Sequence, residues 1–343
     1  MTDLDIKKST QNDSVKYLSV SETAEQWDIS ERSVRNYCAE GRIIGAKLEG
    51  GIWFIPETAE KPERTNKSIE KKLTLLQILR REDRLRTKGG IYHKIQVELT
   101  YNSNHIEGSR LTEDQTRYIY ETNTIGALKK YEGIRVDDVV ETANHFRCID
   151  YIIENANRRL SEHMIKKLHF ILKNGTSDSL EDWFAVGDYK KMPNEVGGQE
   201  TTAPEDVSAA MKKLLKKYRA RKLLDLHDLL AFHYEFEKIH PFQDGNGRVG
   251  RLILFKECLR LNIVPFIIDE DLKMFYYRGL KEWSKESGYL TDTCLAAQDK
   301  FRQILEYYRI YPWFSHRIDI YWYYIKARIN YARGKTDRGG KQS

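Results

Sequence analysis

Residues 240–251 place a histidine, a carboxylate and two arginines within one short stretch, His-Pro-Phe-Gln-Asp-Gly-Asn-Gly-Arg-Val-Gly-Arg. The imidazole of His240 has an ordinary pKa near neutrality, so it is suited to take a proton from a hydroxyl group. Asp244 offers a hard oxygen ligand, and one carboxylate with phosphate oxygens and water is a usual way to hold Mg²⁺. Arg248 and Arg251 lie three positions apart, so both can bind phosphate oxygens. This combination predicts a phosphate site beside a general base.

The segments around this stretch predict how it is held. Apolar residues recur every three or four positions up to His240, so a helix ends there, and Pro241 enforces the stop. Residues 244–247 then form a glycine-rich loop, and a second helix is expected to begin at Arg248. Backbone N–H groups in such a loop, together with the dipole of the following helix, form an anion-binding nest.

The whole stretch resembles the signature of the Fic family, and the similarity extends from about Tyr101 to Ser287. The resemblance implies transfer of AMP from ATP to a Tyr, Thr or Ser hydroxyl of a target protein. His240 would be the general base, Phe242 would anchor the loop in the core, and Asp244 would hold Mg²⁺ between the α and β phosphates. The implied phosphate-binding residues are Gly245, Asn246 and Gly247, then Arg248 for the β phosphate region and Arg251 for the γ phosphate.

A segment ahead of the motif, residues 190–199, is similar to the flap hairpin of the family. The flap lies over the site and pairs with an extended target segment. Gly197 and Gly198 would form its turn, and these glycines and Val196 would lie beside the nucleotide.

Two tyrosines downstream of the motif, Tyr276 and Tyr277, resemble an adenine-side position of the family. We select Tyr277 for this role, while a core role explains tyrosines at these positions equally well. Ser284 stands where some members have Asn, so recognition of the base is left open.

The segment Ser103–Gly108 fits the family's inhibitory pattern, which is Ser or Thr, three residues, Glu, then Gly or Asn. It lies well ahead of the motif, where the second class of the family carries it. The carboxylate of Glu107 can pair with Arg251 and occupy the guanidinium that would otherwise hold the γ phosphate. Ser103, one helical turn earlier, would steady this helix, and Gly108 completes the pattern. A resting enzyme that binds ATP unproductively is therefore predicted.

Residues 16–62 read as a separate unit with the order helix, turn, helix, hairpin. The expected elements are a helix capped by Ser21, a second helix from Ser30 to Gly41, and strands Ile43–Lys47 and Ile52–Ile55 around a glycine turn. This order resembles winged helix-turn-helix modules of the excisionase and MerR type, which implies DNA as a partner. Acidic residues outnumber basic ones in this stretch, so a protein-docking or spacer role stays open.

The composition of the 343 residues, 40% hydrophobic and 31% charged with a net charge of +6, describes a soluble globular chain. No apolar run approaches the roughly 18 residues of a membrane span, no export signal is visible, and the four cysteines lie far apart. We therefore expect a cytoplasmic protein without disulfides, zinc or a membrane partner.

The expected fold class is predominantly α, with a Fic-type helical domain, a small β-hairpin flap and an N-terminal winged helix-turn-helix domain. The expected segments are a flexible N-terminus at 1–15, the winged module at 16–62, connecting helices at 63–100, the Fic domain with its inhibitory helix at 101–300, and a C-terminal helix and basic tail at 301–343.

Three functions stay open at this point. The first is an autoinhibited protein adenylyltransferase that uses ATP and Mg²⁺ and modifies a hydroxyl of a target protein or of itself. The second is transfer of a different phosphate-containing moiety. The third is a DNA-binding regulator whose Fic domain senses nucleotide, although a sensor would not need the base His240. A protein that reads two half-sites would be a homodimer.

Overall fold

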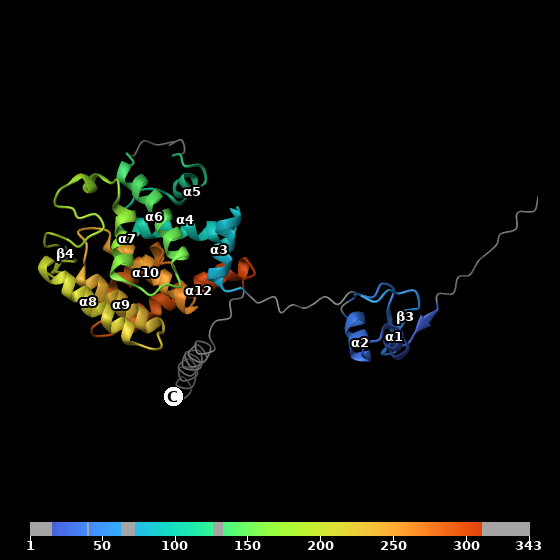
Figure 1. Cartoon of the computed structure of the whole chain (residues 1–343). Helices are drawn as coiled ribbons and strands as arrows, with labels where there is room; N and C mark the ends of the chain where they lie inside the picture. Colours follow the sequence, from blue (N-terminus) through green and yellow to red (C-terminus); the bar gives the residue numbers. More distant parts are fainter. Residues whose placement is uncertain (1–15, 40, 63–72, 126–132, 311–343) are drawn as a thin grey trace, which may run out of the picture. The chain divides into compact units, whose positions relative to one another are not determined.

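The computed structural model describes residues 16–39, 41–62, 73–125 and 133–310 (Figure 1). The chain divides into two units, residues 1–71 and 72–343, and each unit has its own apolar core. The expected N-terminal segment and the basic tail after residue 310 lie outside the described residues. Within the described residues, no helix is both long and apolar enough to cross a membrane.

The first unit packs two helices against a three-stranded antiparallel sheet in the order β1-β3-β2. Its elements are β1 Tyr17–Leu18, α1 Val20–Trp27, α2 Glu31–Ala39, β2 Lys47–Glu49 and β3 Ile52–Pro56. Val34 and Ile55 are fully buried in the core between the helices and the sheet.

Two expectations for this unit are wrong. Ser19, not Ser21, caps α1, because its hydroxyl accepts from the Glu22 N–H at 3.2 Å while the Glu22 carboxylate accepts from the Ser19 N–H at 2.7 Å. This reciprocal pair is a capping box. The first hairpin strand is Lys47–Glu49 rather than Ile43–Lys47, since Gly45 has a φ of 82° and places the preceding residues in a turn.

The second unit is predominantly helical, as its periodicity predicts. Its described residues form α3 Leu75–Leu85, α4 Ile91–Ile106, α5 Glu113–Thr122, α6 Val136–Glu154, α7 Glu162–Lys173, the 3-10 helix η1 Ser177–Leu180, β4 Glu195–Val196, β5 Gln199–Glu200, α8 Pro204–Ala220, α9 Leu226–Ile239, α10 Asn246–Leu261, α11 Glu270–Glu282 and α12 Gly288–Tyr307.

Helix α10 lies at the centre of this unit (Figure 1) and contacts α3, α4, α6, α7 and α9. Every residue from Arg248 to Leu259 is buried, so all sides of this part of the helix are covered. Its buried charged residues, Arg248, Arg251, Lys256 and Glu257, are each paired with other charged side chains. The N-terminus of α10, and the loop that leads into it, therefore rest on a rigid base.

Candidate functional site

His240 occupies the C-cap of α9 in a left-handed conformation, with φ 50° and ψ 63°. Its N–H donates to the carbonyl of Phe236 at 3.0 Å, which closes the last turn of the helix, and Pro241 prevents a further turn. Burial, with a smaller contribution from Lys190, lowers the pKa of His240 to about 4. The imidazole is therefore neutral at physiological pH and has a lone pair that can accept a proton.

The loop between α9 and α10 is held by its own side chains. Phe242 is fully buried and stacks on His169, with ring centroids 4.0 Å apart and planes within 2°. The Asn246 side chain accepts from the Phe242 N–H and donates to the Phe242 carbonyl, both at 2.8 Å. Gly245 has a φ of 79°, a conformation that glycine adopts without cost. Asn246 therefore shapes the loop through its side chain.

Helix α10 begins at Asn246, two residues earlier than the expected start at Arg248. The first N–H groups of a helix have no partner within the helix, so those of the first turn of α10 are available to an anion. The predicted glycine-rich nest and helix N-terminus thus coincide in the structure.

Arg251 is bound by the end of α4. Its guanidinium lies 2.7 Å from the Glu107 carboxylate and donates to the hydroxyl and the carbonyl of Ser103, at 3.1 and 2.8 Å. Glu107 is the C-cap of α4, and Gly108 has a φ of 93° that lets the chain turn away. A Cβ atom on Gly247 would lie 2.4 Å from the Glu107 carboxylate, so a larger residue at this position would force the carboxylate to shift.

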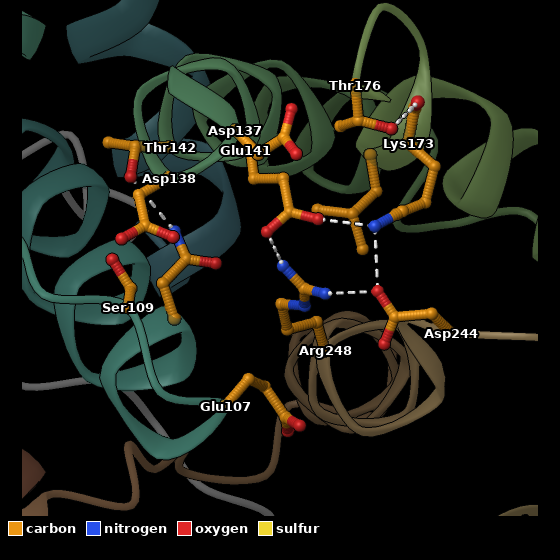
Figure 2. Close-up of polar contacts among 12 residues, drawn as sticks. Glu107, Ser109, Asp137, Asp138, Glu141, Thr142, Lys173, Thr176, Asp244 and Arg248 are labelled. Atoms are coloured by element: carbon orange, nitrogen blue, oxygen red, sulfur yellow. Dashed lines mark hydrogen bonds and ion pairs between the residues drawn. The ribbon is translucent and has the colours of Figure 1, made fainter. Parts of the chain in front are cut away.

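Arg248 belongs to a second cluster, in which four charged side chains alternate in sign (Figure 2). Its guanidinium bonds to Glu141 of α6 and lies 3.1 Å from Asp244. Lys173, at the end of α7, lies 2.6 Å from Glu141 and 2.7 Å from Asp244. Burial alone would raise the pKa of Asp244, but Arg248 and Lys173 together hold it well below its usual range. Asp244 is therefore ionised.

Sequence reasoning missed Glu141 and Lys173. One signal for Lys173 was available, because it continues a stripe of inward positions that includes Leu168 and Leu172. A lysine on a buried helical stripe needs a charged partner. No local pattern distinguishes Glu141 from a solvated acidic residue.

The segment predicted as the flap, residues 190–199, is joined by hydrogen bonds to the loop between α9 and α10. The Lys190 N–H donates to the Pro241 carbonyl, and the Met192 N–H donates to the side-chain oxygen of Gln243. The Asn194 amide donates to the carbonyls of Phe242 and Gln243, at 3.0 and 3.5 Å. Strands β4 and β5 pair Glu195 with Glu200 and Val196 with Gln199, around a turn at Gly197-Gly198. Val196 is exposed.

The two selected tyrosines differ in their surroundings. Tyr276 is fully buried, and its hydroxyl lies 2.6 Å from His233, so it belongs to the core. Tyr277 is 41% exposed, and its hydroxyl donates to the carbonyl of Ile106 at the end of α4. Ser284 follows α11 and is exposed. Tyr277 thus contacts the helix end that carries the predicted inhibitory residues Ser103 and Glu107.

Together, a neutral imidazole at a helix end, a helix N-terminus with two arginines and an ionised carboxylate can bind a polyphosphate and accept a proton beside it. These features define a site suited to phosphoryl or nucleotidyl transfer. In this structure, a carboxylate at the end of α4 pairs with Arg251 and a carboxylate of α6 pairs with Arg248.

Comparison with known proteins agrees with this class. Residues 159–257 match the model of the Fic/DOC family, so the chain contains a Fic/DOC family domain. Protein adenylyltransferase Fic of Drosophila mojavensis is 28% identical over 193 residues, which make up 53% of this chain and 35% of that protein. The same protein of Drosophila persimilis is 29% identical over 193 residues, 53% of this chain and 35% of that protein. The chain thus matches about a third of the length of these curated relatives.

Solved structures resemble about two thirds of this chain as well. A Fic domain-containing signalling protein from Bacteroides thetaiotaomicron aligns with a TM-score of 0.51 and 26% identity, covering 68% of this chain and 90% of that chain. A fragment of Fic-1 from C. elegans aligns with a TM-score of 0.52 and 20% identity, covering 67% of this chain and 69% of that chain. The second likeness concerns the fold alone.

Proposed function

We propose that this chain is an autoinhibited protein adenylyltransferase that moves AMP from ATP to a hydroxyl of a target protein. The observation that carries the proposal is the neutral, half-buried His240 at the entrance of a loop that presents the N-terminus of α10. The names of the curated relatives support the same activity.

In the proposed reaction, the hydroxyl oxygen of the target attacks the α phosphorus of ATP. The bond from the α phosphorus to the bridging oxygen breaks, pyrophosphate leaves, and the hydroxyl proton passes to the imidazole of His240. The N–H groups of Gly247 and its neighbours at the start of α10 stabilise the negative charge of the phosphates. Flap residues 190–199 position the target segment by pairing with it.

Asp244 in this loop suits a magnesium ion that binds together with the phosphates of ATP. The described residues contain no group of three or more His, Cys, Asp or Glu side chains around one point. Asp244 is half exposed, and only its Oδ2 atom takes part in the bonds to Lys173 and Arg248, so Oδ1 can serve as a ligand. A single carboxylate suits Mg²⁺ because this ion keeps much of its water. When bound, the metal would supply positive charge to the phosphates.

In this proposal, AMP transfer is inhibited because Arg251 is already bound by other residues of the chain. The γ phosphate of ATP needs this guanidinium, which Glu107 and Ser103 hold at the end of α4. ATP bound without this contact would lie with its α phosphorus out of line with the attacking hydroxyl, and positioning supplies much of the acceleration in such reactions.

The test is incubation of the purified full chain with α-labelled ATP, Mg²⁺ and a cell lysate. We expect labelled protein bands with wild type, no labelled bands with His240→Ala, and unchanged labelling with His163→Ala, a matched variant at an exposed position of α7. Label transfer by the His240 variant at the wild-type rate would exclude the proposed base. Binding of ATP without any transfer would favour the sensor function. Label from another phosphate-containing donor only would favour the alternative transfer reaction.

A second candidate property concerns the first unit. Helix α2 exposes Arg32 and Arg35 opposite the buried Val34, as a helix that enters a major groove would. Arg35 lies 2.7 Å from Glu31, so part of this charge is cancelled locally. We propose salt-sensitive DNA binding, tested by titrating random-sequence duplex at two salt concentrations. Arg32→Ala should weaken it, and absence of binding at low salt would favour the protein-docking role.

A further inference from the structure

The side chain of Lys173 packs against the proposed catalytic loop, residues 240–245, from the interior of the protein. A Cβ atom on Gly245 would lie 3.7 Å from the Lys173 Cδ atom, so the aliphatic stem packs against the loop. Only 2% of the Lys173 side chain is exposed. Its ammonium group therefore reaches Asp244 from within the protein.

The ammonium is bonded to carboxylates on two sides. It lies 2.7 Å from Asp244 and 2.6 Å from Glu141, with the more exposed Asp178 at 3.3 Å. The two close carboxylates, both within 2.7 Å, supply the negative charge that a buried ammonium group needs. A buried ammonium is retained only with such partners.

The four side chains form a closed ring, from Glu141 to Lys173, then Asp244, Arg248 and back to Glu141 (Figure 2). The ring itself contains two positive and two negative charges. Asp178 adds a negative charge outside the ring, on a side chain that is 42% exposed and therefore largely screened by solvent. Lys173 and Arg248 already offset the negative charge of Asp244. A divalent cation that binds Asp244 is therefore attracted less strongly than it would be by an unpaired carboxylate. A bare ion gains little there, whereas an ion that arrives with a triphosphate brings compensating negative charge.

On the basis of the proposed function, we propose that Lys173 is a resident counterion of Asp244 that competes with the divalent metal. Asp244 then binds the metal ion tightly when the ion is bound to a nucleotide and only weakly when the ion is alone. Lys173 acts through Asp244, so it is a positioning residue rather than a catalytic one.

The experiment measures binding of Mn²⁺ by the full chain, from the loss of the free-ion electron paramagnetic resonance signal. It is performed with Mn²⁺ alone and with Mn²⁺ plus the ATP analogue AMPPNP. Lys173→Met should bind Mn²⁺ alone at least tenfold more tightly than wild type, with a smaller gain when AMPPNP is present. Adding Asp244→Asn to Lys173→Met should abolish the gain, which assigns it to this carboxylate.

Two controls separate charge from packing. Lys173→Arg keeps the charge and should show no gain, and Lys256→Met removes another buried lysine, which lies 2.6 Å from Glu257, and should leave Mn²⁺ binding unchanged. If Lys173→Met does not fold, Lys173→Gln removes the charge with a polar side chain and should show the same gain.

Equal or weaker Mn²⁺ binding by a folded, uncharged variant at Lys173 would overturn the inference, because Lys173 would then merely orient Asp244. A gain that survives Asp244→Asn would overturn it as well. The readout does not depend on AMP transfer. A chain that shows the expected metal binding but transfers no label would refute the proposed function and leave the counterion role of Lys173 standing.

Discussion

Removing the charge of Glu107 should activate the enzyme without disturbing the fold. The carboxylate lies 2.7 Å from the Arg251 guanidinium, whose side chain is 6% exposed, while 30% of the Glu107 side chain is exposed. Two unit charges about 4 Å apart interact by about 4 kcal/mol at an effective dielectric constant of ~20. Since Glu107 is partly solvated, we reduce this to about 2 kcal/mol.

About 2 kcal/mol corresponds to roughly a thirtyfold change in the population of free Arg251. Glu107→Gln, which keeps the shape of the side chain, should therefore increase AMP incorporation from α-labelled ATP about thirtyfold. Glu107→Gly should increase it at least as much. Ser103 remains in both variants and continues to orient the guanidinium through its carbonyl and hydroxyl.

The matched control is Glu98→Gln, which removes a carboxylate of the same helix that pairs with Lys94 at the surface. This variant should label at the wild-type rate. If Glu107→Gln and Glu107→Gly both label no faster than wild type, while His240→Ala removes all label, the pair does not restrain the enzyme and the inhibition argument fails.

Three further outcomes are expected. Ser103→Ala leaves a buried guanidinium N–H unpaired and should lower the free energy of unfolding by about 1–3 kcal/mol, whereas no loss in urea titration would contradict this role. Phe242→Ala, which empties a fully buried site against His169, should cost about 3–5 kcal/mol and abolish labelling, and Phe242→Leu should restore most stability. Burial lowers the pKa of His145 to about 3 in the fold, so the unfolded chain binds the extra proton and stability is lost as the pH falls from about 6.5. That loss reaches about 2 kcal/mol at pH 5, and a chemical-denaturation series in which His145→Gln keeps the wild-type pH slope would refute it.

The elements of the site that lie close in sequence could be predicted from it. His240, Asp244 and Arg251 fall on one helix end, one loop and one helix start, so local periodicity and turn chemistry suffice to place them together. The link between Glu107 and Arg251 spans 144 positions, and only the resemblance to a family pattern suggested it.

The charged ring could not be predicted in the same way. Glu141 and Lys173 reach Asp244 and Arg248 because α6 and α7 pack against each other and against α10. These contacts span 71 and 107 positions, and helix periodicity shows which face is buried but not which partner covers it.

The error at the first helix has a simpler cause. Ser19 and Ser21 are both good capping residues, but only Ser19 has a glutamate, Glu22, three positions later. That spacing is the capping-box signature, and it decides between them.

The two carboxylates that pair with the arginines of α10 should respond differently to the same substitution. Glu107 sits at the end of a helix and is partly solvated, so its loss frees Arg251 while the surrounding contacts persist. Glu141 is 13% exposed and binds both Lys173 and Arg248, so Glu141→Gln leaves two buried cations with too little negative charge. Breaking a buried pair in this way costs about 3–5 kcal/mol. We therefore expect Glu141→Gln to lower the melting temperature without raising AMP incorporation. A stable Glu141→Gln variant that labels faster than wild type would mean that the restraint on this site is distributed over both arginines rather than concentrated on Arg251.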